Sequence, residues 1–171
     1  MIFVLASSIR GADPFVFDAP KEWRPERIPF PLGFAPELKY RGFEELRFGP
    51  GMFRPGTETY WTYVFFWWIE GNQKFTKEGL EKDLRAYYRG LSNAVGKPRG
   101  FKIIPDKITA SLQPNTEGKV EGPKSLPKFT GILRTYDAFK TGRLLKLNIE
   151  ISQHHFKDIN RTWVFFSVSP H

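Results

Sequence analysis

The sequence predicts an α+β fold, in which an antiparallel sheet of about five or six strands carries one main helix packed on a face. The length of 171 residues suits one domain with its own core. A single segment has the periodicity of an amphipathic helix, and the segments around it alternate with the period of two that is typical of strands. The strands after the helix follow one another through short turns, which favours antiparallel pairing.

The predicted helix begins after Thr76, a residue type that caps helix N-termini, and extends to about Asn93. Its apolar side chains recur at the spacing that places them on one stripe: Leu80, Leu84, Tyr87, Tyr88 and Leu91. We therefore expect one face of this helix to pack against the sheet.

The most aromatic segment of the chain is Tyr60–Ile69, which we interpret as a strand. Alternate side chains of a strand point to opposite faces. One predicted face carries Trp61, Tyr63, Phe65, Trp67 and Ile69, and the other carries Tyr60, Thr62, Val64, Phe66 and Trp68. Both faces are apolar, which predicts a central strand that is covered on both sides.

The remaining predicted strands are Phe43–Phe48, Ile108–Gln113, Phe129–Tyr136, Leu145–Ser152 and Thr162–Val168. Prolines recur through residues 13–42, so we interpret that segment as an extended strap that lays apolar side chains along the domain. Residues 114–128 are predicted to form a loop. The resulting order of elements is that of cystatin-like and nuclear-transport-factor-like rolls, a likeness of topology that implies no activity.

The composition excludes several classes of protein. The chain has no cysteine, which excludes disulfides, thiol nucleophiles and thiolate metal sites. No window reaches the ~18 consecutive apolar residues of a membrane-spanning helix. The glycine-rich patterns that bind dinucleotides and phosphates are missing, as is the serine nucleophile elbow. The unusual features are an aromatic content of 16% and a net charge of +8, a balance that suits either a polyanion partner or a soluble basic surface.

Two sets of titratable residues invite a metal or catalytic interpretation. His154 and His155 are neighbours, and on a strand neighbours point to opposite faces, so we predict no metal site and no cofactor. Glu44 and Glu45 precede Arg47, and Glu70 ends the aromatic segment; two such carboxylates on one sheet face could form an acid-base pair if burial raised the pKa of one of them. Arg47, however, lies beside Glu45 as a ready ion-pair partner, and we assign no catalytic residue.

The first residues are apolar and then small, the pattern found at the end of a secretory signal peptide, although the apolar run is short and no basic residue precedes it. Residues 1–12 are interpreted either as the remnant of a signal peptide or as a first strand, and residues 13–171 as a single α+β domain. The first interpretation predicts a periplasmic or secreted protein, and the second leaves a cytoplasmic location open.

The segments Ile28–Pro36 and Gly42–Phe53 resemble a family of uncharacterised bacterial proteins, many of them exported. The likeness extends through Trp67-Trp68 and to Tyr136–Phe139, and so covers most of the chain. The short apolar start of this chain departs from the exported pattern of that family. The resemblance implies no activity and no functional residues.

Our first functional hypothesis is a non-enzymatic binding or accessory domain, in which the curved sheet and its helix enclose an aromatic-lined hollow for an apolar or glycan ligand. The hypothesis assigns the surface of the hollow to Trp61, Tyr63, Trp67 and Trp68, and ligand orientation to Arg47 or Glu70. The simpler interpretation of the same aromatic residues is a packed core.

The alternative is a nucleic-acid or polyanion binder that uses Lys97, Arg99, Lys102, Arg134, Lys140 and Arg143. A carboxylate-dependent hydrolase ranks last, because no substrate can be named for it. Neither the ligand nor the oligomeric state follows from the sequence.

Overall fold

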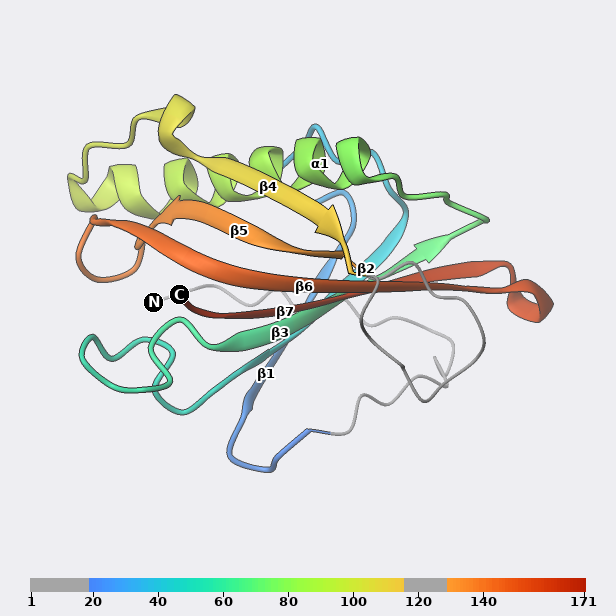
Figure 1. The fold of residues 1–171 in the computed structure, drawn as a ribbon, viewed down its shortest axis with the longest axis horizontal. Coiled ribbons are helices and arrows are strands. Elements are labelled where there is room, and N and C mark those ends of the chain that lie inside the picture. Colours follow the sequence, from blue (N-terminus) through green and yellow to red (C-terminus); the bar gives the residue numbers. More distant parts are fainter. Residues whose placement is uncertain (1–18, 116–128) are drawn as a thin grey trace.

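The computed structural model describes residues 19–115 and 129–171. One helix packs on an open antiparallel sheet with the strand order β1-β2-β3-β7-β6-β5-β4 (Figure 1), which confirms the predicted α+β class. The sheet is 7-stranded and so has one strand more than the upper end of our prediction. The predicted signal remnant at 1–12 and nearly all of the predicted loop at 114–128 lie outside the described residues.

The strands are β1 (Arg24–Pro29), β2 (Gly42–Phe48), β3 (Tyr63–Glu70), β4 (Thr109–Pro114), β5 (Phe129–Tyr136), β6 (Leu144–Phe156) and β7 (Arg161–Pro170). Helix α1 (Lys77–Leu91) continues through a π-helical turn, η1 (Ser92–Gly96), and a 3₁₀ turn, η2 (Lys97–Arg99). Two further 3₁₀ turns are η3 (Pro105–Lys107), before β4, and η4 (Lys157–Ile159), between β6 and β7. Thr76 caps α1 as predicted, because its hydroxyl accepts a hydrogen bond from the Gly79 amide.

The additional strand is β1, which lies inside the segment that the sequence analysis interpreted as a strap. It forms the edge of the sheet, pairing only with β2 in the described chain. The Phe30 amide donates to the Gly42 carbonyl at 3.0 Å, and bonding positions alternate along an antiparallel pair. Pro25 and Pro29 therefore occupy positions that point away from β2, where the missing N–H costs no ladder bond. Among the described residues of that segment, the part between β1 and β2 acts as a strap.

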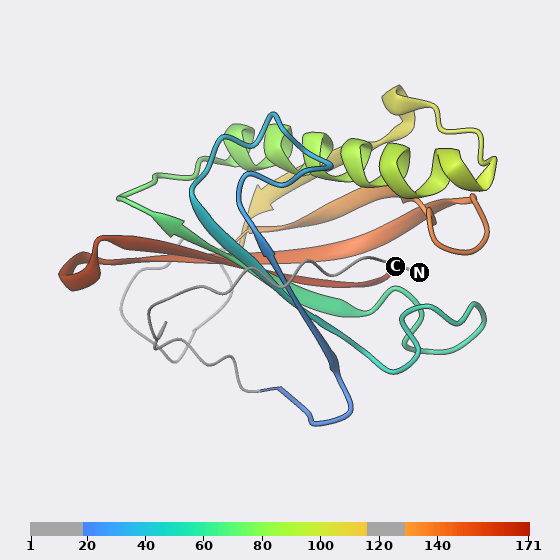
Figure 2. The same ribbon diagram turned by 180° about the vertical axis from the view of Figure 1, so that it is seen from behind.

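The strap, residues 30–41, crosses over α1 on its way from β1 to β2 (Figure 2). The crossing is close: a Cβ added at Gly90 of α1 would lie 2.0 Å from the Phe34 carbonyl oxygen. A glycine at this point of the helix lets the two backbones touch. Helix α1 is thus held between the strap and the sheet.

Strand β3 lies near the middle of the sheet between β2 and β7, and its two faces are both buried as predicted. Tyr63, Phe65, Trp67 and Ile69 belong to the main core under α1, whereas Phe66 and Trp68 belong to a smaller cluster on the opposite face. The strand begins at Tyr63 and not at Tyr60. Trp61 has a φ of 57°, and this left-handed conformation cannot continue a strand.

Candidate functional site

A cavity of about 510 Å³ lies between the sheet and the C-terminal part of the helical segment. Its size is within the usual range of ligand pockets, roughly 300–1,000 Å³. Its walls come from β1, β2, β3, α1, the strap and two loops. The lining residues are Arg24, Glu26, Ile28, Phe34, Leu46, Phe48, Met52, Phe53, Trp61, Tyr63, Tyr87, Leu91, Val95, Arg99, Phe139 and Lys140. Most of them are apolar, and the charged ones are few.

The sheet wall follows from the register of β1 and β2. Arg24 pairs with Phe48, Glu26 with Leu46, and Ile28 with Glu44. Paired residues of neighbouring strands share a face, so the even-numbered side chains of both strands point toward α1. The pairing therefore places the side chains of Ile28, Leu46 and Phe48 in the cavity wall, together with the charged side chains of Arg24 and Glu26.

The helical wall depends on the extension of α1 beyond its predicted end. Tyr87, Leu91, Val95 and Arg99 line the cavity and recur at every fourth position. We predict from the sequence that the helix ends near Asn93, but the π turn and the 3₁₀ turn continue it to Arg99. Without this extension neither Val95 nor Arg99 would be positioned over the cavity.

Asp137 joins the two loops that border the cavity. Its carboxylate accepts hydrogen bonds from the Tyr60 hydroxyl (2.5 Å) and the Trp61 indole N–H (3.3 Å) of one loop. It also accepts from the amides of Lys140 (3.1 Å) and Thr141 (2.6 Å) in its own turn. Burial opposes ionisation of Asp137, but these bonds outweigh it and lower the pKa of the carboxyl. One ionised side chain thereby fixes the loops that carry Trp61 and Phe139.

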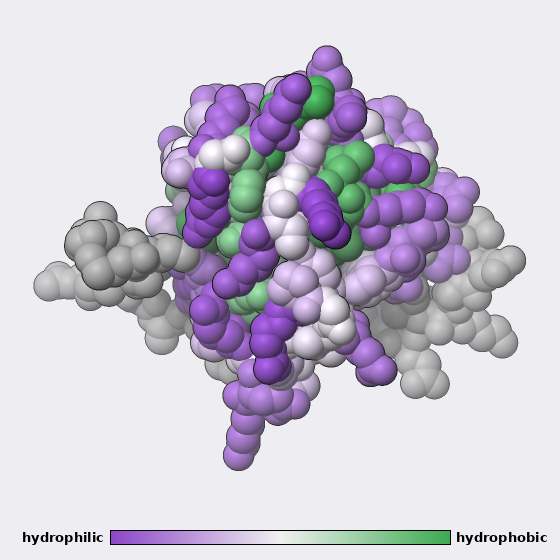
Figure 3. Space-filling view, turned by 90° about the vertical axis from the view of Figure 1, so that its left-hand side faces the viewer, coloured by the Kyte–Doolittle hydropathy of each residue, from purple (hydrophilic) through white to green (hydrophobic). Residues whose placement is uncertain are grey.

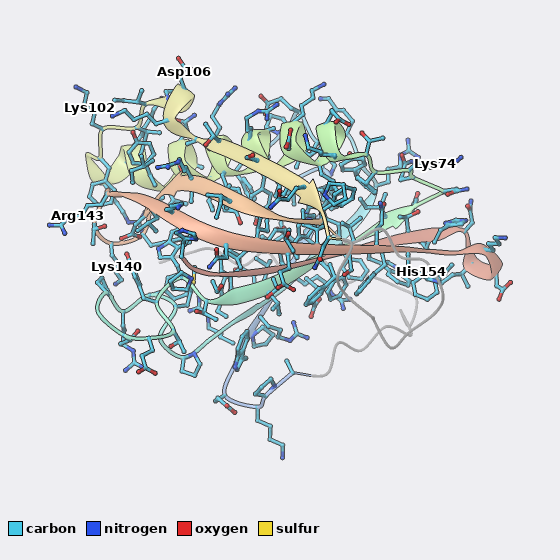
Figure 4. All side chains as sticks on the ribbon, viewed as in Figure 1. Lys74, Lys102, Asp106, Lys140, Arg143 and His154 are labelled. Carbon is cyan, nitrogen blue, oxygen red and sulfur yellow. The ribbon has the colours of Figure 1, made fainter. Side chains whose placement is uncertain are left out.

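The charged lining residues are three cations and one carboxylate, and the cations are exposed. The Arg24 guanidinium lies 5.0 Å from the Phe53 ring centre and 5.4 Å from that of Phe48. The Arg99 guanidinium donates to the Val95 carbonyl at 2.7 Å. Seen from the end of the molecule to which Arg143 and Lys140 extend, apolar side chains remain visible among hydrophilic ones (Figures 3 and 4).

Away from the cavity, the same helix–sheet interface is filled and contains a buried carboxyl group. Glu44 is fully buried and accepts hydrogen bonds from the Trp67 indole N–H at 3.0 Å and the Tyr87 hydroxyl at 3.3 Å. Burial raises the pKa of Glu44 to about 8, against the opposing effect of these two bonds, and the nearby Glu26 carboxylate adds to the rise. Tyr87 therefore connects this polar group to the cavity wall.

The residues that the sequence hypothesis named are divided between the two faces of the sheet. Trp61 and Tyr63 line the cavity. Trp67 is fully buried beside Glu44. Trp68 is 3% exposed and belongs to the cluster on the opposite face. The structure therefore brings only part of the hypothesised aromatic set to one hollow.

Arg47 and Glu70 are not lining residues of the cavity. The Arg47 guanidinium is 2.5 Å from the Glu45 carboxylate, on the face of β2 that points away from α1. Glu70 is half exposed at the end of β3, with its carboxylate 3.4 Å from Arg161. Glu45 and Glu70, the two carboxylates of the hydrolase hypothesis, both have cationic partners.

The histidine pair lies on β6, which extends further than predicted. The His154 ring packs edge-on against Phe156 with ring centres 4.5 Å apart, and His155 Nδ1 lies 3.3 Å from the Thr162 hydroxyl. Residues 19–115 and 129–171 contain no group of three or more histidine, cysteine or acidic side chains that could hold a metal ion. The described part of the chain also has no helix that is both long and apolar enough to cross a membrane.

Sequence reasoning missed most of the cavity lining. The available signal was the alternation of Glu44, Leu46 and Phe48 with Phe43 and Glu45, which predicts one apolar face of β2. The contributions of Phe34, Phe53 and Phe139 have no comparable signal, because they come from irregular segments that only the tertiary fold brings together.

Comparisons with protein-family models, with curated protein sequences and with solved structures give no match for this chain.

Proposed function

We propose that this protein is a non-enzymatic binding domain whose cavity takes a small, mainly apolar ligand. The observation that carries the proposal is the cavity of about 510 Å³ under the end of the helical segment, with aliphatic and aromatic walls. Natural ligand sites have the same character, with apolar walls and a few placed polar groups.

The lining favours an apolar ligand over a glycan. A sugar needs several hydrogen-bonding side chains around it, because its hydroxyl groups lose water on binding. The apolar lining residues include Leu46, Phe48, Met52, Leu91 and Val95. None of these side chains offers a strong donor or acceptor.

The first test is titration with the uncharged fluorophore N-phenyl-1-naphthylamine, which brightens in apolar surroundings. We expect saturable binding to the unmodified protein. Val95→Trp should reduce that binding about tenfold or more, because the larger side chain occupies the space that the ligand needs. Native mass spectrometry of the purified protein provides an independent measurement, and a released apolar compound would give the mass of the natural ligand.

The matched control is Ile159→Trp, which adds an indole at a 50% exposed position in η4, a turn that contributes no cavity lining residue. It should bind the fluorophore as the unmodified protein does. If a folded Val95→Trp protein binds equally well, the cavity is not the binding site.

The second candidate function is polyanion binding. In its favour, Lys102, Lys140 and Arg143 lie at the same end of the molecule (Figure 4). A surface that neutralises several phosphates loses affinity steeply as salt rises. Oligonucleotide binding with that steep salt dependence, abolished by Lys102→Ala with Arg143→Ala, would favour this function over the first.

A further inference from the structure

The charges around the cavity indicate what kind of apolar molecule it takes, an inference that rests on the proposed function. Its three cations come from separate segments: Arg24 begins β1, Arg99 ends η2, and Lys140 lies in the turn between β5 and β6. Two aromatic rings connect two of these cations. Arg24 lies 5.0 Å from the Phe53 ring centre, that ring is 5.1 Å from the ring of Phe139, and Lys140 follows Phe139.

These cations are distinguished by their place at the cavity. Several other basic residues pair with carboxylates: Arg47 with Glu45, Arg161 with Glu70, and Lys77 with Glu81. Within residues 19–115 and 129–171, Arg24, Arg99 and Lys140 have no carboxylate within ion-pair distance. Their charge is thus available to a bound anion.

The backbone and the aromatic rings hold these cations at the cavity. Stacking on Phe48 and Phe53 leaves the N–H groups of Arg24 available, since a guanidinium on a ring face points its donors outward. One guanidinium nitrogen of Arg99 donates to the Val95 carbonyl, and the other N–H donors of this side chain can still bind an anion. The turn that carries Lys140 is fixed by Asp137.

Among the lining residues in the described part of the chain, Glu26 is the one carboxylate, and it lies between Arg24 and Ile28 on the same face of β1. The lining therefore keeps a net positive charge. Glu26 should repel an anion that lies deep along β1 and tolerate one that stays at the rim beside Arg24 and Lys140. The charge pattern thus favours a ligand with its anionic group at the mouth and its apolar part inside.

We propose that the ligand is an amphiphilic anion, with an apolar body in the cavity and a carboxylate or phosphate headgroup paired with Arg24, Arg99 and Lys140. Guanidinium groups match both headgroups through paired N–H donors. The two sources of such a ligand, a free fatty acid and a singly alkylated phosphate, share this chemistry and are separated by the experiment.

The experiment measures displacement of N-phenyl-1-naphthylamine by four molecules with one decyl chain: decanoate, decyl phosphate, decanol and decyltrimethylammonium. Charge-assisted hydrogen bonds are the strongest polar contacts available here, so the anions should displace the fluorophore at concentrations about tenfold lower than decanol. Decyltrimethylammonium should be the weakest. Which of the two anions is the stronger competitor indicates the source of the natural ligand.

Substitutions identify the groups involved. Arg24→Ala and Lys140→Ala should each weaken anion displacement several-fold more than decanol displacement, because they remove charge and little of the apolar wall. Glu26→Gln should strengthen anion binding without effect on decanol. Lys102→Ala with Arg143→Ala is the matched control, since both residues lie at the same end of the molecule and neither lines the cavity.

The outcomes separate this inference from the proposed function. If decanol competes as well as decanoate and decyl phosphate, the anionic headgroup is wrong and the apolar binding site stands. If the control substitutions weaken anion binding as much as Arg24→Ala and Lys140→Ala do, the charge acts as a diffuse field and the assigned contacts are wrong. If none of the four molecules displaces the fluorophore, both proposals fail.

Discussion

The two ends of the helix–sheet interface contain the same kinds of residue but differ in what lies opposite them. At the closed end, Trp67 meets Phe30 edge-on at 5.9 Å between ring centres, and Tyr40 meets Phe75 at 5.5 Å. At the open end, Phe53 and Phe139 contact each other at 5.1 Å and border the cavity. At the closed end, Phe30 and Tyr40 of the strap fill the space over the sheet, whereas at the open end strap and helix residues line a cavity. Aromatic content alone therefore does not distinguish a core from a binding wall.

The largest expected effect is on the closed side of this comparison. Phe65 is fully buried and stacks on Phe166 with ring centres 4.3 Å apart. Phe65→Ala should lower the free energy of unfolding by about 3–5 kcal/mol, because truncating a packed aromatic residue leaves a cavity. Phe53→Ala, at the open end, should cost about 1 kcal/mol, because its ring already borders empty space. Urea denaturation measures both, and equal losses would contradict the distinction between the two ends.

A second effect concerns the pH dependence of stability at the closed end. The pKa of Glu44 is about 8 in the folded protein and 4.5 for an ordinary glutamate. The folded state therefore keeps a proton that the unfolded chain releases, and stability falls as pH rises from about 4.5 to about 8. Glu44→Gln removes this fall. Near pH 8 the Glu44→Gln variant should be more stable than the unmodified protein by a few kcal/mol at most, because each pKa unit corresponds to about 1.4 kcal/mol.

The control for Glu44 is its neighbour in the chain. Glu45 lies on the opposite face of β2, between Arg27 and Arg47. Glu45→Gln removes the partner of both arginines and should give no gain in stability at any pH. Thermal unfolding over the pH range measures both variants. A gain for both would mean that general charge reduction, and not the burial of Glu44, is responsible.

A third effect is expected at the open end. Asp137→Asn weakens the bonds that hold Tyr60 and the Lys140 turn and should cost about 1–2 kcal/mol at neutral pH. Because the pKa of Asp137 is lowered on folding, its contribution is present above its ordinary value of 3.8 and lost as pH falls through the folded value. The difference between variant and unmodified protein should therefore shrink in acid. Hydrogen exchange of the Lys140 and Thr141 amides should accelerate in the variant, and unchanged exchange would contradict the role assigned to Asp137.

The sequence was sufficient for the elements whose periodicity is local. The cap at Thr76 and the alternation of faces along β3 were predicted and are confirmed. Strand β1 was missed, because prolines disfavour strands in general and are tolerated at an edge whose outward positions need no donor. The predicted start of β3 at Tyr60 was too early, because Trp61 has a left-handed backbone conformation. Nothing in a run of apolar residues indicates such a conformation.

The candidate site was less predictable than the fold. Alternation shows which residues of β2 share a face, but it does not show whether that face points to a helix. Our hypothesis assigns ligand orientation to Arg47 or Glu70, and neither of them lines the cavity. Arg47 lies on the opposite face of the sheet from Arg24, whose position depends on the pairing of β1 with β2, a tertiary contact.

The crossing of the strap over α1 also places a constraint on sequence change. The contact between Gly90 and Phe34 involves backbone atoms, so it cannot be relieved by a rotamer change or by a smaller neighbour. Related chains that keep the strap in this place should therefore have glycine at position 90, even where the apolar residues around it vary. A glycine at this place in the helix, together with a proline-rich segment upstream, would mark this architecture among sequences too divergent to share a recognisable core.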